Sequence, residues 1–361
     1  MRILHIHTKL VSGGIEAIVC GLANEMVKSH DVTVCTIFEP HDDDVFYSRL
    51  KPEVKKITCG KKNFGFSIKE IFDITRLFLK GNYDVIHVHG CFQYYALAAL
   101  LCHSKVKIFY TIHSDAIKEN QTWDKRLFVF KKFCFKHRWI RPVTISKSSQ
   151  RSFEALYGCN SDMVENGVAE SQIKCDFSFL NKYRKTENTL LFFHAGRISE
   201  PKNQVVLCQV FQSIINKGND VVLIIAGMKE DKTIFSSIEK YLGERIIYIG
   251  EQKNVPQLMY EADAFCLPSI WEGLPVTLLE SLSVGCIPIC SPVGGIVDVI
   301  DDGQNGFLSH SSDKEDYENK IEYFVKLNKT ERERIKINAK NSFQKYNIIT
   351  TASKYLEIYD N

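Results

Sequence analysis

Apolar and polar residues alternate along the first half of the chain in two recurring patterns. Short apolar runs with the length of buried strands occur at residues 1–8, 31–38, 84–89, 107–113 and 141–146. Segments with apolar residues at helical spacing lie between them, for instance at residues 15–29 and 94–102. Short buried strands that alternate with helices predict a parallel α/β sheet.

The alternation weakens over residues 166–188, where polar residues dominate, and then begins again. In this second half we predict strands at residues 189–195, 220–226, 245–249, 264–267 and 287–290. Helices are predicted at residues 203–217, 255–261, 278–284 and near 297–301, and a last amphipathic helical segment at 330–360. The chain is therefore expected to form two doubly wound sheets.

These patterns predict two Rossmann-like domains, for which a length of 361 residues is comfortable. The first domain is expected at residues 1–168, a linker at 169–188, and the second domain at 189–340. A C-terminal helix at 341–361 is expected to cross back to the first domain. Ligands of open α/β sheets bind at the carboxyl ends of strands, so two such edges that face one another would form a cleft.

Composition indicates a soluble cytoplasmic protein. Hydrophobic residues make up 45% and charged residues 25% of the chain, as is usual for globular proteins. The N-terminal apolar run is too short for a signal peptide, and no run of about 18 apolar residues predicts a membrane-spanning helix. The 12 cysteines are scattered without a Cys-x-x-Cys pair, which favours reduced thiols over a metal or disulfide framework.

Charge is unevenly distributed along the chain. The net charge of +3 is too small to suggest a nucleic-acid partner. Residues 1–165 carry a net charge of +7, however, and the remainder carries −4. A basic first half is suited to an anionic partner or a membrane surface.

The most informative motif contains two carboxylates, Glu272 and Glu280, with seven residues between them. Glu272 stands in a turn beside Gly273, and Glu280 lies in the first turns of a predicted helix. Helix N-termini carry free N–H groups and the positive end of the peptide dipoles, so they attract anions. A site that takes phosphate on backbone N–H groups and hydroxyls on carboxylates suits a nucleotide sugar.

A second motif, Gly196-Arg197 with Lys202-Asn203, follows a predicted strand and opens a helix. Arg197 can grip a diphosphate with its forked donors, and Lys202 can add a compact positive charge. Two fixed cations could replace the metal that other diphosphate-handling enzymes use. A solvated loop with ordinary surface charges is the alternative.

Two further candidates stand at predicted strand ends in the first half. The paired glycines of Ser12-Gly13-Gly14 would let a ligand approach the backbone closely, although a tight turn without a ligand is the alternative. His113 could hydrogen-bond a sugar hydroxyl or assist a reacting group, or be purely structural. His89 flanks another strand end as a weaker candidate, and His87 is expected to be a core histidine.

Two motifs favour other interpretations. Asp42-Asp43-Asp44 contains Asp-x-Asp, a metal–diphosphate signature of another transferase class, but helix capping explains it better. The segment from Trp123 to Ile140 is basic and aromatic. On a helix, one of its faces is expected to pack on the core: Trp123, Leu127, Phe130, Phe133 and Cys134. The other stripe resembles an interfacial membrane contact or packs under a neighbouring loop: Phe128, Phe135 and Trp139.

Together these motifs resemble the retaining glycosyltransferases of family 4, which have the GT-B fold. The likeness spans nearly the whole chain, and the Glu-x7-Glu element is its most specific part. It is carried by Ser12-Gly13-Gly14-Ile15-Glu16, His113, Asn166-Gly167-Val168, Gly196-Arg197, Lys202-Asn203, Pro268-Ser269, Glu272-Gly273, Glu280, Gly294-Gly295 and Asn305-Gly306-Phe307.

The resemblance implies a catalytic role for four residues. Arg197 and Lys202 would bind the donor diphosphate and stabilise the charge of the leaving group. Glu272 would orient the transferred sugar through its hydroxyls, and His113 would contact that sugar. No metal and no enzymic nucleophile are required in this scheme, so no cofactor is expected.

The resemblance also implies a set of donor-binding groups. The N–H groups of Gly273 and Leu274 would line the sugar and phosphate, and Glu280 would hold the ribose hydroxyls. The loop after Gly250 would border the base, and Gly14 would bring first-domain backbone to the phosphates on closure.

Two departures from the family pattern bear on these contacts. Leu274-Pro275 stand where the family often has an aromatic residue and a glycine, and Pro275 has no N–H to offer a phosphate. Gly227-Met228-Lys229 lacks the second glycine that is common at that position, which affects base and ribose contacts.

The sequence thus predicts a metal-independent retaining glycosyltransferase with a nucleoside-diphosphate sugar as donor, UDP favoured. The acceptor is expected to be a lipid-diphosphate-linked glycan at the cytoplasmic membrane face, in capsule or other cell-surface polysaccharide assembly. A nucleotide-sugar epimerase or phosphorylase on the same scaffold, and a non-catalytic nucleotide- or glycan-binding protein, are the alternatives.

Overall fold

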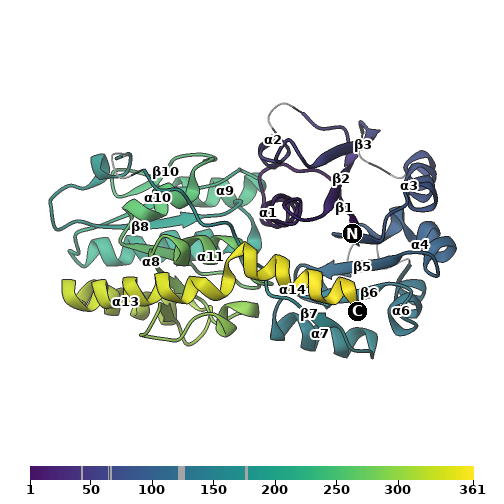
Figure 1. Cartoon of the computed structure of the whole chain (residues 1–361). Coiled ribbons are helices and arrows are strands. Elements are labelled where there is room, and N and C mark those ends of the chain that lie inside the picture. Colours follow the sequence, from purple (N-terminus) through teal and green to yellow (C-terminus); the bar gives the residue numbers. More distant parts are fainter. Residues whose placement is uncertain (42–43, 64, 66, 121–126, 175–177) are drawn as a thin grey trace. The chain divides into compact units, whose positions relative to one another are not determined.

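The computed structural model describes residues 1–361 except 42–43, 64, 66, 121–126 and 175–177. The chain divides into two compact units. Unit 1 comprises Met1–Ala169 and Asn347–Asn361, and unit 2 comprises Glu170–Tyr346. Each unit is built on a parallel sheet with surrounding helices (Figure 1), which is the α/β class that the alternating pattern predicts.

The sheet of unit 1 runs in the order β3-β2-β1-β4-β5-β6-β7, with parallel neighbours. The order reverses between β1 and β4, and ligands of open sheets bind at such a switch point, outside the carboxyl ends of the strands. The strands are β1 (Arg2–His7), β2 (Asp31–Phe38), β3 (Lys55–Lys61), β4 (Val85–Val88), β5 (Lys107–Ile112), β6 (Arg141–Thr144) and β7 (Asp162–Met163).

Helices of unit 1 cover both faces of this sheet. They are α1 (Gly14–Met26), α2 (Val45–Ser48), α3 (Ile68–Lys80), α4 (Ala96–Cys102), α5 (Ala116–Glu119), α6 (Phe128–Lys136), α7 (Lys147–Tyr157) and α14 (Ile348–Asp360), with the 3-10 turn η1 (Phe92–Tyr94). One face of the sheet forms an apolar core with α3, α4, α6 and α7, to which β1 and β4 contribute Leu4, Ile6, Ile86 and Val88.

The alternate residues of β1 and β4 point to the opposite face and include His5, His7 and His87. His5 pairs in register with His87, so their side chains lie on the same side of the sheet. Helix α14 (yellow in Figure 1) packs here, because the ring of Tyr355 lies 4.9 Å and that of Tyr359 5.8 Å from the His87 ring. A segment at the very end of the chain thus completes the core of unit 1.

The sheet of unit 2 runs in the order β10-β9-β8-β11-β12-β13, again with parallel neighbours. Its order reverses between β8 and β11, which places the second switch point there. Strand β9, with the sequence VVLIIA, is buried throughout, as expected for a central parallel strand. The strands are β8 (Leu190–Ala195), β9 (Val221–Ala226), β10 (Ile246–Tyr248), β11 (Ala264–Leu267), β12 (Ile287–Cys290) and β13 (Phe307–Leu308).

The helices of unit 2 are α8 (Gln204–Asn216), α9 (Lys232–Glu239), α10 (Val255–Glu261), α11 (Val276–Ser283), α12 (Lys314–Lys326) and α13 (Lys329–Ser342). Short 3-10 turns occur at η3 (Asn181–Tyr183), η4 (Glu200–Lys202), η5 (Gly294–Asp298) and η6 (Phe343–Tyr346). The helix expected near residues 297–301 is instead η5, and the chain turns after it because the Asn305 side chain accepts a hydrogen bond from the Asp301 N–H at 2.8 Å.

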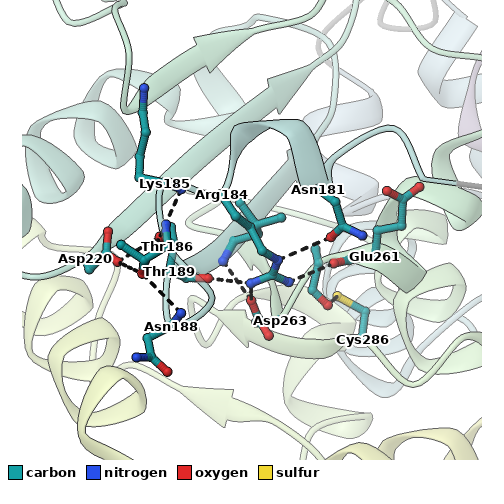
Figure 2. A network of polar contacts seen from close by, with 12 residues as sticks. Asn181, Arg184, Lys185, Thr186, Asn188, Thr189, Asp220, Glu261, Asp263 and Cys286 are labelled. Carbon is teal, nitrogen blue, oxygen red and sulfur yellow. Dashed lines mark hydrogen bonds and ion pairs between the residues drawn. The ribbon is translucent and has the colours of Figure 1, made fainter.

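The polar stretch at the start of unit 2 is fixed to its sheet by side-chain bonds (Figure 2). The Arg184 guanidinium donates to the carbonyl of Thr189, to Asp263 Oδ2 at 2.9 Å and to the Glu261 carbonyl at 3.3 Å. The Thr189 hydroxyl in turn donates to Asp220 Oδ2 at 2.8 Å. Residues 181–189 are therefore an ordered edge of unit 2, although their composition resembles that of a linker.

The helical segment expected at residues 330–360 is broken. Helix α13 and the turn η6 end in unit 2, and α14 starts at Ile348 in unit 1. Asn347 makes the break, because its backbone is extended and its side chain caps α14 by accepting from the Ile349 N–H at 3.0 Å.

The aromatic stripe predicted to contact membrane is packed inside unit 1 instead. The Phe128 ring lies 5.5 Å from that of Tyr157, and Phe135 is 1% exposed. Trp139 stacks on His103 with ring centroids 3.9 Å apart. The membrane alternative is therefore wrong for this stripe and the packed alternative is confirmed, with α7 and the end of α4 as partners that sequence spacing could not reveal.

The face of this helix that was expected to meet the core does so in part, because Leu127 and Phe130 pack against it while Phe133 is more open. Phe133 is 41% exposed and its neighbour Val129 is 81% exposed. Cys134 is buried as expected, whereas Trp123 lies outside the described residues. The Asp42 and Asp43 side chains of the acidic motif also lie outside them, and Asp44 occupies the N-cap position of α2.

Candidate active site

Two candidate residues of unit 2 meet at its switch point. Lys202 ends η4, which follows β8, and Glu272 lies in the loop between β11 and α11. The Lys202 ammonium is 2.5 Å from Glu272 Oε1, and the Ser269 hydroxyl donates to the same oxygen at 2.7 Å. Among the described residues none bonds to Glu272 Oε2, so this oxygen is available to a hydroxyl donor.

The two loops that carry this pair are tied together by their backbones. The Ile270 N–H donates to the Pro201 carbonyl at 2.8 Å. The Asn203 side chain donates to the Pro268 carbonyl at 3.1 Å, and Asn203 itself adopts the left-handed conformation with φ 56°. These bonds fix the separation of Lys202 and Glu272, which a preorganised site requires.

Gly294 allows a third loop to approach the pair. A Cβ atom at this residue would lie 2.0 Å from the Glu272 carbonyl oxygen, and its φ of 56° also favours glycine. The next residue, Gly295, donates its N–H to the Gly273 carbonyl at 2.6 Å. Gly294 and Gly295 therefore pack against the backbone of the Glu272-Gly273 turn and fix it by a hydrogen bond.

His194 is a positioning residue that sequence reasoning missed. Burial lowers its pKa to about 4, so the ring is neutral at neutral pH. Nδ1 donates to the Cys266 carbonyl at 2.9 Å, and Nε2 therefore accepts from the Gln204 amide at 3.1 Å. The same amide donates to the Arg197 carbonyl at 2.8 Å, which anchors the loop after β8. The sequence signal for this role is a histidine two residues before Gly196.

Arg197 lies on this loop but points to a different partner. Its guanidinium pairs with Glu230 at 2.8 Å, and both side chains are well exposed. Exposed ion pairs contribute little, so an incoming diphosphate can replace Glu230 at small cost. The structure thus brings Lys202 to Glu272 and leaves Arg197 in a separate pair.

The remaining unit 2 candidates surround the start of α11. Gly273 and Leu274 are buried in the turn before it, and Glu280 lies in its second turn, partly exposed. Gly250 follows β10 and accepts from the Gly227 N–H at 2.9 Å.

Proline in this turn removes a donor just before the helix. Pro275 occupies the N-cap position of α11, directly before its first helical residue. The missing N–H therefore precedes the helix, and the N–H groups of Val276 and Thr277 remain at its first turn.

In unit 1, Gly14 is the first residue of α1, directly after the loop that follows β1. The carboxylate of Glu16 bends back over this loop, since a Cβ at Gly13 would lie 2.2 Å from Glu16 Oε2. The His7 ring lies 3.3 Å from the other carboxylate oxygen. A phosphate approaching Gly14 would therefore meet an acidic neighbour as well as the helix N-terminus.

His113 follows β5 and is held on two sides. Its backbone N–H donates to Glu119 Oε2 at 3.2 Å, and its ring Nε2 lies 3.0 Å from His89 Nδ1. Glu119 also accepts from the Tyr110 hydroxyl at 2.6 Å, and that hydroxyl accepts from the buried Lys131 at 3.1 Å. Burial lowers the pKa of His113 to about 3, so its ring is neutral in solution near pH 7.

A group of three buried histidines invites comparison with a metal site. One ring nitrogen from each of His5, His87 and His89 lies within 4.8 Å of the others. His87, however, bonds through its two ring nitrogens to Tyr359 and Thr111, and the ring of His89 lies 4.1 Å from that of His87, only 35° from parallel. Lone pairs lie in the ring planes, so such rings do not converge on one ion without rearrangement.

Family comparisons agree with this geometry. The family described as "Glycosyltransferase Family 4" matches residues 12–172, and "Glycosyl transferases group 1" matches residues 177–342. The chain belongs to the group 1 glycosyltransferases. The two matched regions carry the unit 1 and the unit 2 candidates respectively, and the chain is accordingly a glycosyltransferase.

Two curated relatives of this glycosyltransferase act on lipid-linked glycans, according to their names. It is 22% identical, over 81% of its length and 79% of the relative's, to an Escherichia coli UDP-Gal:alpha-D-GlcNAc-diphosphoundecaprenol alpha-1,3-galactosyltransferase. It is 25% identical, over 99% of its length and 98% of the relative's, to a Campylobacter jejuni alpha-1,4-N-acetyl-D-galactosaminyltransferase with a diphosphoundecaprenol-linked glycan in its name.

Solved structures show the same fold. HepE from Anabaena, crystallised with UDP and glucose, aligns over all of both chains with a TM-score of 0.83 at 17% identity. Sucrose-phosphate synthase from Thermosynechococcus elongatus aligns over 99% of this glycosyltransferase and 98% of that chain, with a TM-score of 0.82 at 16% identity. The expected GT-B fold of two α/β domains is therefore confirmed.

Proposed function

We propose that this glycosyltransferase moves a sugar from a nucleoside-diphosphate donor, UDP favoured, to a lipid-diphosphate-linked glycan, with retention of anomeric configuration. The observation that carries the proposal is the Lys202–Glu272–Ser269 cluster at the β8/β11 switch point. A fixed cation beside a carboxylate with one open oxygen suits a diphosphate next to a hydroxyl-bearing sugar. The names of the two curated relatives support the acceptor class.

Mechanistically, Lys202 and Arg197 would stabilise the charge that develops on the departing diphosphate. Glu272 Oε2 would accept from a sugar hydroxyl while Oε1 stays bonded to Ser269. Glu280, in the second turn of α11, would take the ribose hydroxyls. Gly273, Leu274 and Gly250 would line the phosphate and base. In unit 1, Gly14 would approach the phosphates and His113 the sugar. Positioning and charge stabilisation suffice in this scheme, without a protein nucleophile or a metal.

Donor binding is tested by thermal shift with UDP, GDP and their sugars, because a ligand above its dissociation constant raises the melting temperature. We expect stabilisation by UDP and a UDP-sugar, unchanged by EDTA. Transfer is then measured with a short polyprenyl-diphosphate glycan, and the anomeric configuration of the product is read by NMR. Donor consumption without acceptor would favour an epimerase, and indifference to every nucleotide would overturn the donor assignment.

An exposed apolar face of unit 1 supports action at an anionic membrane surface, the cytoplasmic face being the proposed location. Helices α3, α4 and α6 cover the same side of the sheet (Figure 1) and expose Phe72, Leu79, Leu100, Leu101, Val129 and Phe133. The same helices and their ends expose the cations Lys69, Arg76, Lys80, Lys105 and Lys136. Apolar side chains among cations suit peripheral contact with anionic lipid. No helix of the described residues is long and apolar enough to cross a bilayer.

This lipid contact is tested by co-sedimentation with vesicles that contain phosphatidylglycerol. We expect binding that falls with salt and with the triple substitution Phe72→Ser, Val129→Ser, Phe133→Ser. The matched control, Tyr323→Ser with Ile337→Ser, removes comparably exposed apolar side chains from unit 2 and should leave binding unchanged. Equal binding of all three proteins would remove the membrane face from the proposal.

A further inference from the structure

Three imidazoles, those of His5, His89 and His113, form a continuous hydrogen-bonded row. His5 Nδ1 lies 3.3 Å from His89 Nε2, and His89 Nδ1 lies 3.0 Å from His113 Nε2. His5 and His89 are completely or almost completely buried, whereas His113 is partly exposed. The row therefore runs from the interior of the unit 1 sheet to the carboxyl end of β5, where a ligand is expected.

Hydrogen counting leaves this row only two arrangements. Burial lowers the pKa of His5 to about 4 and that of His89 well below its ordinary value, so both rings are neutral near pH 7. A neutral imidazole has one N–H donor and one acceptor nitrogen. Since both nitrogens of His89 bond to imidazoles, His89 must donate to one neighbour and accept from the other. Reversing one of the two hydrogen bonds therefore reverses the other and changes the tautomer of all three rings.

The inner end of the row decides between the two arrangements. His5 Nε2 is buried and, among the described residues, has no hydrogen-bond partner. If the bonds pointed inward, this nitrogen would carry a buried N–H without an acceptor, which is the rarer defect in folded proteins. If the bonds point outward, His5 Nε2 carries only an unused lone pair. The outward arrangement puts the hydrogen of each ring on Nδ1.

The backbone keeps the central ring in place. His7 Nδ1 donates to the backbone carbonyl of His89 at 2.8 Å. The His7 ring therefore fixes the backbone of His89 and is not itself a member of the row. At the outer end, no described residue bonds to His113 Nδ1. That nitrogen is the one that can meet a substrate.

We propose that His5 and His89 are positioning residues that hold His113 in the tautomer with its hydrogen on Nδ1, which makes the ring a fixed donor to a substrate oxygen. The proposal rests on the proposed function only in giving His113 a sugar to contact. A ring locked as a donor can pair with a sugar hydroxyl or with an oxygen that only accepts. Such a donor needs no reorganisation when the substrate arrives.

The tautomer can be measured directly without any substrate. The full chain would be labelled with 15N-histidine, and long-range 1H–15N spectra would distinguish protonated from unprotonated ring nitrogens. His113 would be assigned from the resonances lost in His113→Asn. We expect a protonated Nδ1 and an unprotonated Nε2 in the wild type. A protonated Nε2 in the wild type would overturn the proposal by itself.

Variants test whether the inner histidine sets the tautomer. In His5→Met, the thioether sulfur can only accept, so His89 should donate to it from Nε2 and the His113 resonances should move toward the Nε2-protonated tautomer. His5→Leu offers neither donor nor acceptor, and a buried lone pair on His89 Nε2 costs less than a buried N–H there, so the Nδ1-protonated signal should persist. His87→Asn is the matched control, since His87 is equally buried on the same face but bonds to Tyr359 and Thr111 outside the row. Unchanged His113 resonances in His5→Met would end the idea.

Kinetics separate positioning from general damage. In the transfer assay, His5→Met should lower kcat about tenfold with little change in the donor KM, and His5→Leu, which keeps the tautomer, should lose clearly less. Lower kcat with an unchanged tautomer would show a merely structural role and reject the proposal. If no nucleotide sugar is consumed by the wild type, the proposed function fails while the spectroscopic result still decides the tautomer.

Discussion

The ammonium of Lys202 lies 2.5 Å from Glu272 Oε1, although the two residues follow different strands of unit 2. The side chains are 19% and 11% exposed, so the pair is poorly solvated and yet reachable. A donor diphosphate would compete with Glu272 for the ammonium. The carboxylate would then turn to hydroxyl donors, which links phosphate binding to sugar orientation.

Replacing Lys202 by Met should reduce kcat/KM by at least about 100-fold, because a fixed charge aimed at the leaving group is lost. The measurement is steady-state transfer, accompanied by thermal shift with UDP, which should weaken in parallel. Lys185→Met is the control, since it removes an exposed 3.0 Å ion pair with Glu244 in the same unit. Similar losses in both variants would show that general surface charge, and not this site, controls the rate.

Ser269→Ala should lower kcat/KM about tenfold by removing one hydrogen bond to the carboxylate. Ser269 is fully buried, and its hydroxyl is 2.7 Å from Glu272 Oε1. The control is Ser281→Ala, which deletes an equally buried hydroxyl that donates to the Leu278 carbonyl within α11. Equal kinetic effects of the two substitutions would contradict a role in orienting Glu272.

Gly294→Ala should destabilise unit 2 and impair transfer. The loss should exceed that expected from the backbone strain of a positive φ alone. The added Cβ would lie 2.0 Å from the Glu272 carbonyl oxygen, so the turn that carries Glu272 must shift. Gly303→Ala provides the comparison, because Gly303 has φ 77° but nothing within 4 Å of an added Cβ. We expect about 1 kcal/mol of destabilisation for the control and a clearly larger loss for Gly294→Ala. Chemical denaturation and kcat/KM would measure both.

The sequence predicted those features of the fold and site that depend on local pattern. Buried parallel strands show as short apolar runs, and the residues just after them must gather at one edge of each sheet. Lys202 and Glu272 each follow a predicted strand of the second half, so the pattern alone places both at that edge.

Partners that meet only through tertiary packing could not be predicted. His5 and His89 are 84 residues apart and bond because β1 and β4 are neighbours in register. Both stripes of helix α6 are aromatic, and only the packing of Phe128 and Phe135 against Tyr157 of α7 shows that their stripe is covered. The buried Lys131 on that helix would have been placed at the surface by composition alone.

The histidine-rich face should make the stability of unit 1 depend on pH. Burial lowers the pKa of His5 from 6.5 to about 4 and that of His113 to about 3, and it lowers those of His87 and His89 as well. The unfolded chain therefore binds more protons than the folded chain as pH falls below 6.5. The stability from these neutral rings is complete above pH 6.5 and is lost progressively toward pH 4.

Each histidine that is neutral only in the folded state should cost about 1 kcal/mol per pH unit over this window. We expect the melting temperature to fall steeply between pH 6.5 and 4, as measured by calorimetry. The double variant His5→Leu with His87→Leu should flatten that slope, even if it lowers stability at pH 7. Replacing the exposed His310 by Ala should leave the slope unchanged. An equally steep slope in the double variant would mean that carboxylates, and not these buried imidazoles, set the acid sensitivity.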